Sequence, residues 1–404
     1  MRFCTSGAAV RGQIGRVLAA FLLAMTGASA EEAGRMNRAA KTELGTSALF
    51  AADGTLLAAS KQGEHVVLFK SSDLGRHWSS PIRVNAVPEA ISADGENRPK
   101  LALAADGALL VAWTHPLAEP YSGAVRLARS TDGGASFSPP LTVHRDRQEI
   151  THRFESLIVG GDGRVYLAWI DKRDLERAKR EQAAYRGAAI YVAVSNDGGR
   201  SFQPEVKVAD HSCECCRIAA ALDGDGAPLL LFRHVFEPNE RDFALAKLGA
   251  DGTPRSFARA TFERWRVDGC PHHGPSLAVA ADGTRHAIWF NVVEGEGKTF
   301  HGRLHEGRVE GQRIVAGAQA SHADIIVGGR RVVLAWKEFD GERTLIRAEI
   351  STDGGQSFAP LTLAETTGAS DQPRLLSRGE EVFLFWRSEN EGMRLIPVRP
   401  RDVR

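Results

Sequence analysis

Two short motifs contain most of the residues that could bind a metal ion. The first is HSCECCR, with Cys213, Cys215 and Cys216, and the second is DGCPHHGP, with Cys270, His272 and His273. Thiolate sulfur and imidazole nitrogen suit a soft or borderline ion, Cu(I) or Zn(II), and the two motifs together supply more than four donors. In an exported protein copper is the favoured ion and zinc the alternative, because Cu(I) prefers sulfur and adjacent histidines can hold it through oxidation.

The same four cysteines also fit a disulfide framework without metal. Outside the cytoplasm four cysteines can form two bridges, which would pin the two motifs together. A bridge between Cys215 and Cys216 would be strained, so Cys213 or Cys216 is the better partner for Cys270. Thiol redox chemistry is a third interpretation, although no thioredoxin-like pattern accompanies the C-x-C sequence.

Three further histidines, His152, His234 and His322, are second candidates for metal ligands. Each of them alone also fits a hydrogen-bonded core or surface residue. The case for a shared role is that they are expected at the same level of a repeated sheet. The elements that would position them are therefore the next question.

Seven stretches share one pattern: an apolar run, a D-G or G-G turn, and a second apolar run that often ends in tryptophan. SLIVGGDGRVYLAW is an example. Alternating apolar residues around such turns predict β-hairpins, and their regular recurrence indicates a repeat architecture. Further apolar strands follow most hairpins, so one unit is predicted to be a four-stranded antiparallel sheet.

A second motif, S-x-D-x-G followed by an aromatic residue, appears four times and contains Asp73, Asp132, Asp197 and Asp353. In a tight turn the aspartate accepts hydrogen bonds from backbone N–H groups, and the glycine adopts a positive φ. The aromatic residue packs between strands. These four aspartates are predicted to be structural.

The two patterns together predict an all-β fold, a β-propeller of four-stranded blades. Seven blades fit best, and six is the alternative if one hairpin lies outside the ring. The segment Ala39 to Leu44 would complete the last blade and remove an exposed sheet edge. In such a fold the innermost strands start, and the second strands end, on the face opposite the aspartate turns. That face, the propeller mouth, would hold the cysteine and histidine residues.

The aspartate-turn motif and the blade pattern resemble the BNR, or Asp-box, repeats of the sialidase (neuraminidase-like) superfamily, over nearly all of the mature chain. The resemblance implies a propeller whose Asp-boxes lie away from the active site. It also implies an alternative function, an exo-sialidase-like glycoside hydrolase. Its candidate residues are four arginines that could grip a carboxylate and a carboxyl pair: Arg98, Arg153, Arg217, Arg233, Glu155 and Asp171.

The chain departs from that family in its tyrosines. The family's nucleophile comes from a late blade, whereas Tyr121, Tyr166, Tyr185 and Tyr191 all lie in the first half of this chain. The family's Arg-Ile-Pro element near the first blade is also absent. The fold resemblance therefore does not by itself imply hydrolysis.

The N-terminus predicts export. It carries Arg2, Arg11 and Arg16, then an apolar run, and then Ala28-Ser29-Ala30. This pattern fits a signal peptide over residues 1–30 cleaved after Ala30, a periplasmic location, and one propeller domain over 31–404. Removing the three arginines changes the formal charge from +1 to −2. That near-balance argues against a nucleic-acid partner. No membrane span is expected after cleavage, and the expected partners are a metal ion or small-molecule ligand at the mouth, or another protein.

One insertion, residues 171–187, has no strand pattern and is rich in helix formers. It predicts a short charged helix over the mouth. Such a helix could be a lid or a partner surface, or equally a solvated decoration.

Overall fold

The computed structural model describes residues 43–269, 271–317 and 319–399. These residues belong to one compact unit. The predicted signal peptide, its cleavage site after Ala30, and Cys270 lie outside the described residues.

The chain forms antiparallel sheets from strands that are consecutive in sequence. The first contains β1 (Ser47–Phe50), β2 (Leu56–Gln62), β3 (His65–Ser71) and β4 (Ile82–Arg83). The second contains β5 (Lys100–Leu103), β6 (Leu109–Pro116), β7 (Gly123–Ser130) and β8 (Leu141–Thr142). The third contains β9 (His152–Val159), β10 (Val165–Asp171), β11 (Ala188–Ser195) and β12 (Val206–Ser212).

The next four strands are β13 (Ala219–Leu222), β14 (Pro228–Phe236), β15 (Glu240–Leu248) and β16 (Pro254–Arg259). One residue pair, Ser212 with His234, joins β12 to β14 and so merges these strands with the third set into an eight-stranded sheet. Then follow β17 (Ser276–Val279), β18 (Arg285–Val293), β19 (Glu296–His305) and β20 (Arg308–Ala316). The last two sheets are β21 (Ala320–Gly328), β22 (Arg331–Phe339), β23 (Thr344–Ser351) and β24 (Ala359–Thr366), and β25 (Arg374–Arg378), β26 (Glu381–Ser388) and β27 (Gly392–Pro397).

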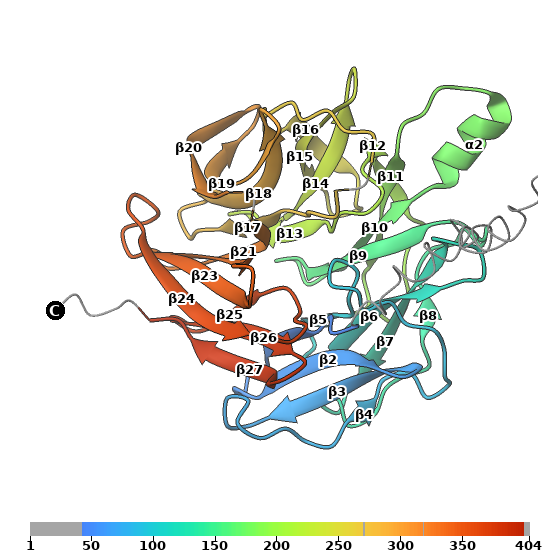
Figure 1. The fold of residues 1–404 in the computed structure, drawn as a ribbon. Helices are drawn as coiled ribbons and strands as arrows, with labels where there is room; N and C mark the ends of the chain where they lie inside the picture. Colours follow the sequence, from blue (N-terminus) through green and yellow to red (C-terminus); the bar gives the residue numbers. More distant parts are fainter. Residues whose placement is uncertain (1–42, 270, 318, 400–404) are drawn as a thin grey trace, which may run out of the picture. The chain divides into compact units, whose positions relative to one another are not determined.

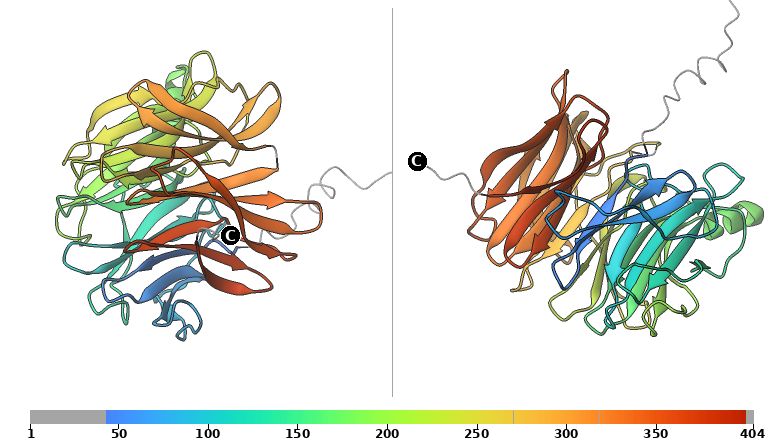
Figure 2. Two further views of the ribbon diagram at one scale, coloured as in Figure 1. Left: turned by 90° about the vertical axis from the view of Figure 1, so that its left-hand side faces the viewer. Right: turned by 90° about the horizontal axis from the view of Figure 1, so that it is seen from below.

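The first strands of these sets lie next to one another in chain order. β1 contacts β5, and contacts continue through β9, β13, β17, β21 and β25, which in turn contacts β1. Figure 1 shows the sheets following one another around a common centre, and Figure 2 shows the red β25–β27 sheet beside the blue first sheet. The predicted all-β, propeller-type architecture of four-stranded antiparallel sheets is therefore confirmed.

The last sheet differs from the prediction because it has three strands in the described residues rather than four. Most of the segment expected to complete it, Ala39 to Thr42, lies outside those residues, and Glu43 and Leu44 form no strand. The chain there turns toward the centre instead. Gly45 N donates to Ala93 O, and Thr46 N donates to the Asp371 carboxylate.

Apolar side chains fill the space between neighbouring sheets. The second strand of a set is covered on both faces, so β10 is buried along its whole length and is apolar up to its last residue, Asp171. One core cluster packs Leu110 and Leu127 of the second set against Leu167 and Trp169 of the third. These layers hold the first strands in place around the centre.

The four aspartate turns share the same hydrogen bonds. In the turn after β7, Ser130 Oγ donates to Asp132 Oδ1 at 2.7 Å, and Gly134 N donates to Ser130 Oγ at 2.7 Å. Ser136 N donates to Asp132 Oδ1 at 2.9 Å. Each turn connects a third strand to a fourth, whereas the cysteine motif follows the fourth strand β12. The turns and the cysteines therefore lie at opposite ends of the sheets.

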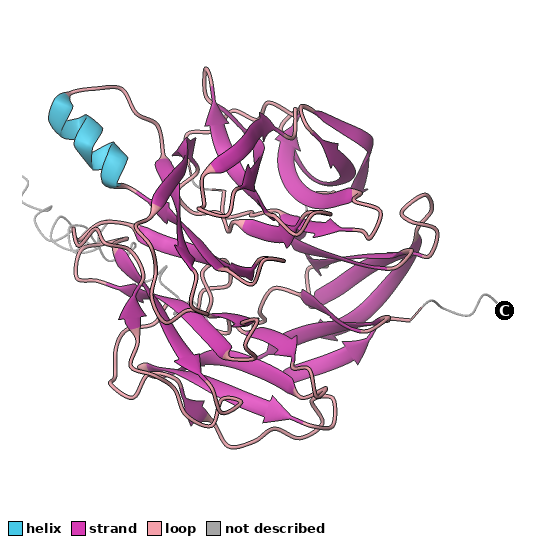
Figure 3. Ribbon diagram, turned by 180° about the vertical axis from the view of Figure 1, so that it is seen from behind, coloured by secondary structure: helices cyan, strands magenta, loops and turns pink. Residues whose placement is uncertain are grey.

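Helix α2 (Arg173–Glu181) lies within the insertion at 171–187. It stands at the edge of the unit, as Figure 3 shows. Its buried Asp174 accepts a hydrogen bond of 2.7 Å from the Tyr191 hydroxyl, which fixes the helix to β11. Among the described residues no helix is long and apolar enough to cross a membrane.

Candidate metal centre

Three cysteine sulfurs lie together in the loop between β12 and β13. Cys213, Cys215 and Cys216 are at most 5% exposed, and their Sγ atoms all lie within 4.8 Å of one another. Cys213 Sγ is 4.0 Å from Cys215 Sγ and 3.8 Å from Cys216 Sγ. The loop is anchored to the next set of strands, because Cys213 N donates to Arg233 O of β14 at 2.9 Å.

These separations fit a shared metal ion. With metal–sulfur bonds of about 2.3 Å, the sulfurs of a tetrahedral site lie about 3.8 Å apart. A disulfide requires about 2.05 Å, so the three cysteines are not bonded to one another. The loop can thus supply three sulfur ligands from four consecutive residues.

Two arginines make the surroundings of the sulfurs electropositive. Arg241 Nη1 of β15 lies 3.6 Å from Cys213 Sγ. The positive charge of Arg233 favours the thiolate form of Cys216. Burial, and then the hydrogen bond with Cys213, raise the pKa of the Cys216 thiol well above its usual range, while the Arg233 charge partly opposes this. Cys216 therefore holds its proton at neutral pH, and a bound metal ion would displace it.

Residues 271–275 lie beside the cysteine loop. Glu96 Oε2 accepts hydrogen bonds from Arg217 N at 2.9 Å and from Gly274 N at 3.2 Å, so one carboxylate ties both loops together. Arg217 Nε also donates to Pro275 O at 3.0 Å. A Cβ added to Gly274 would lie 2.2 Å from Arg217 Cγ, which explains why a glycine occupies this position. Cys270, in this loop, is outside the described residues.

The histidines of the mouth form a separate cluster in the described structure. The His273 ring stacks on Phe290 at 4.1 Å and on His322 at 5.0 Å between centroids. His322 Nδ1 lies 3.1 Å from Glu96 Oε1 and 2.9 Å from Gln372 Nε2. Burial, together with the neighbouring His322, lowers the pKa of His273 to about 3. Within the described residues, the group whose ligand atoms lie within 4.8 Å contains the three sulfurs and neither these histidines nor His272.

His152 and His234 likewise lie outside the sulfur group. The His152 ring stacks on His144 at 3.9 Å, and its Nδ1 lies 3.1 Å from Gly123 O. The His234 ring packs against Phe236 at 4.4 Å between centroids. Both histidines are buried, and burial lowers their pKa values. The structure therefore assigns them packing contacts.

The arginines considered for a carboxylate grip are largely occupied by the protein itself. Arg98 donates to Gly95 O, Thr46 O, Asp371 and Gln372. Arg217 donates to Glu96, Gln372, Pro275 O and Ala323 O. Arg233 donates to Arg241 O, Asn291, His273 O and Phe290 O. Arg153 stacks over the Phe154 ring at 5.3 Å.

The predicted carboxyl pair and the tyrosines are also used in packing. Glu155 is buried, its Oε2 accepts from Thr114 at 2.6 Å, and burial raises its pKa. Asp171 accepts from the Trp169 indole at 2.8 Å and from Arg173. The hydroxyl groups of Tyr166, Tyr185 and Tyr191 each donate to an aspartate, and Tyr121 is 77% exposed. This arrangement gives little support to hydrolysis.

Two residues of this centre were not predicted from the sequence. Glu96 lies in ADGENRPK, where the Asp-Gly pair resembles an ordinary hairpin turn. Arg241 lies at the start of β15, within a run of charged and apolar residues that gives no local signal. Both act on residues far away in the chain, which a single sequence does not reveal.

Solved structures with similar folds include two polysaccharide lyases. The chain is similar to a PL25 ulvan lyase (TM-score 0.57, 13% identity, 87% of this chain and 91% of that chain). It is also similar to the polysaccharide lyase Uly1 (TM-score 0.53, 11% identity, 89% of each chain). A variant of the sialidase NanB from Streptococcus pneumoniae gives a TM-score of 0.47 at 9% identity, over 73% of this chain and 65% of that chain.

The similarity to the two polysaccharide lyases supports the predicted propeller-type fold. At these identities the likeness shows the fold alone. No protein-family model matches the chain, and no curated protein matches it in sequence. The fold and site define an all-β, propeller-type protein with a buried cluster of three cysteines.

Proposed function

We propose that this chain is an exported propeller protein that binds a soft metal ion through Cys213, Cys215 and Cys216, with Cu(I) as the favoured ion. The observation that carries the proposal is the cluster of three buried sulfurs with separations of 3.8 and 4.0 Å. Both values match sulfurs that share one ion. Cys270 of the neighbouring loop is the candidate for a further ligand.

The charges around the cluster favour a monovalent ion. Cu(I) with three thiolates carries two negative charges, which Arg241 and Arg233 would balance. Zn(II) with three thiolates carries one negative charge and usually takes a fourth ligand. Zinc is therefore the alternative ion, and it would need Cys270, His272 or His273 to complete its site.

We further propose that the propeller has seven blades. The contacts among the seven first strands, which run from β1 through β25 and back to β1, support this number. Export rests on the N-terminal sequence, and a periplasmic location is compatible with copper bound to sulfur. The hydrolase alternative lacks a supporting observation, because the arginines and tyrosines it needs are bonded within the protein.

Metal and thiol analysis of the mature chain, purified without oxygen, tests the proposal. We expect stoichiometric copper by mass spectrometry and a Cu(I)–thiolate absorption band in the ultraviolet. The variants Cys213→Ser, Cys215→Ser and Cys216→Ser should each lose the band. Glu214→Gln is the matched control, because Glu214 lies in the same loop but pairs with Lys172.

The alternatives give different results. Zinc in place of copper, with the same dependence on the three cysteines, would identify the alternative ion. A chain without metal, with every cysteine in a disulfide, would refute metal binding and favour a stapled protein-binding propeller. Release of the fluorophore from an aryl sialoside would restore the hydrolase interpretation.

A further inference from the structure

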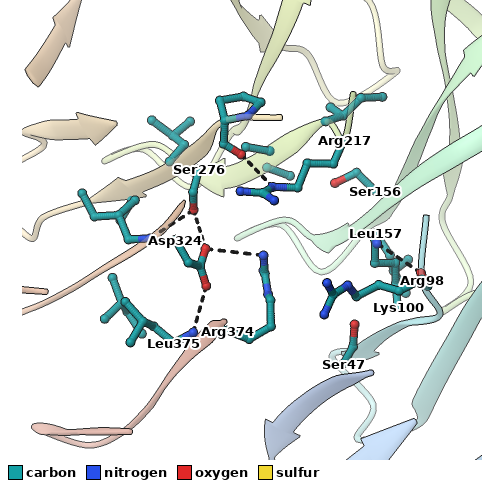
Figure 4. Close-up of a pocket in the computed structure, with 18 of the residues that line it drawn as sticks. Ser47, Arg98, Lys100, Ser156, Leu157, Arg217, Ser276, Asp324, Arg374 and Leu375 are labelled. Carbon is teal, nitrogen blue, oxygen red and sulfur yellow. Dashed lines mark hydrogen bonds and ion pairs between the residues drawn. The ribbon is translucent and has the colours of Figure 1, made fainter. Parts of the chain in front are cut away.

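A cavity of about 300 Å³ lies where the first strands of the sheets converge, separate from the cysteine cluster. Its walls come from β1, β5, β9, β13, β17, β21 and β25. Polar and charged side chains line one part, and apolar residues such as Leu101 and Ile326 line the rest. Figure 4 shows Ser47, Ser156 and Arg374 pointing toward the same open space.

The acceptors around this cavity are already used by the protein. Asp324 Oδ1 accepts from Ser276 Oγ at 2.6 Å, and its Oδ2 accepts from Leu375 N at 2.8 Å. Glu96 accepts from Arg217, Gly274 and Gln372. A ligand entering the cavity would therefore meet carboxylates whose oxygens are occupied.

Several donors, in contrast, have capacity left. Arg374 lies 3.4 Å from Asp324 as an ion pair and makes no side-chain hydrogen bond to another described residue, and 34% of its side chain is exposed. The Ser47 and Ser156 hydroxyls have no hydrogen-bond partner among the described residues. Lys100 Nζ donates once, to Arg98 O at 3.1 Å. Donors exceed acceptors, so the cavity suits an anion.

We propose that this cavity binds a tetrahedral oxyanion of the phosphate class, either inorganic phosphate or a small phosphate monoester. The four donor groups come from four neighbouring strands, β25, β1, β5 and β9. A tetrahedral anion presents oxygens in several directions to donors on different strands, whereas one arginine fork would already satisfy a planar carboxylate. The volume corresponds to about ten water molecules, enough for phosphate with a small organic group.

The Lys100 amine also favours binding of an anion in the cavity. Burial, partly opposed by the charge of Glu155, lowers the pKa of the amine to about 7 and so destabilises the charged form. A phosphate beside the amine would stabilise that charge. The site does not involve the cysteine sulfurs and does not depend on the proposed metal function.

Calorimetric titration of the full mature chain with sodium phosphate at low ionic strength tests the proposal. We expect saturable binding that weakens by about tenfold or more in Arg374→Gln, since a hydrogen-bonded ion pair is lost. Arg378→Gln is the matched control, because this arginine lies on the same strand but bonds Glu381 at the surface. Ser156→Ala, a smaller change, should weaken binding severalfold even if Arg374→Gln fails to fold.

Two further titrations identify the ligand. Glycerol phosphate binding at least tenfold tighter than phosphate would assign the site to a monoester, and the reverse would assign it to the inorganic anion. Acetate binding as tightly as phosphate would overturn the tetrahedral preference. Absence of saturable phosphate binding, or equal losses in Arg374→Gln and Arg378→Gln, would overturn the site itself.

Discussion

Replacing Glu96 by glutamine should strongly destabilise the centre of the protein. Glu96 is 4% exposed and its ion-pair partner Arg217 is 9% exposed on the side chain, so the pair is shielded from water. Its two oxygens accept hydrogen bonds from Arg217, Gly274 and Gln372. An amide NH₂ at either oxygen position would face at least two N–H donors. Removing one partner of a buried pair costs about 3–5 kcal/mol.

The assay is chemical unfolding followed by tryptophan fluorescence, since Trp113, Trp169 and Trp386 are fully buried. Glu381→Gln is the control. Its exposed pair with Arg378 should contribute less than about 1 kcal/mol. A loss below about 1 kcal/mol in Glu96→Gln would refute the assigned role. Adding Arg217→Met should recover part of the loss because the unpaired charge disappears, so purely additive effects would also contradict the reasoning.

Three further perturbations test neighbouring contacts. Arg241→Gln should weaken Cu(I) binding about tenfold, because it removes a charge near a thiolate; competition with a chromophoric chelator measures this, and unchanged affinity would count against it. Gly274→Ala should lower the free energy of unfolding by about 1–3 kcal/mol, because the added Cβ would overlap Arg217. A free energy of unfolding equal to that of the wild type would contradict this. Asp223→Asn should lower the free energy of unfolding by about 1–2 kcal/mol at neutral pH. Burial raises the pKa of the Asp223 carboxyl, but the contacts with Arg285 and Lys247 outweigh burial and lower the pKa from 3.8 to about 2. This contribution is present above pH 3.8 and is lost as pH falls toward 2, so the difference between variant and wild type should vanish there.

The fold could be predicted because its signals are local. Each hairpin and each aspartate turn is encoded within a few residues, as Ser130, Asp132 and Gly134 illustrate. Repetition of these signals indicates stacked sheets, and strand order then places the cysteine loop opposite the turns. The proximity of Cys213, Cys215 and Cys216 follows from their spacing alone.

Contacts between sheets could not be predicted in the same way. Glu96 and Arg217 are 121 residues apart, and neither has a local feature that identifies the other. His152 was expected at the same level as His322, but its ring turns toward His144, where stacking and the bond to Gly123 O fix it. Strand register gives the level of a residue, whereas the direction of its side chain depends on neighbouring sheets.

The arginines at the centre show why position alone does not establish function. Arg98 and Arg217 line the central cavity and were candidates for a carboxylate grip on the basis of the family resemblance. Backbone carbonyls and the carboxylates of Asp371 and Glu96 nevertheless engage their guanidinium groups. An arginine held by this many acceptors is costly to redirect toward a ligand, since each bond must be replaced. The donors with spare capacity belong to Arg374 and the cavity hydroxyls, so anion binding is expected there rather than at the arginines that the family resemblance indicated.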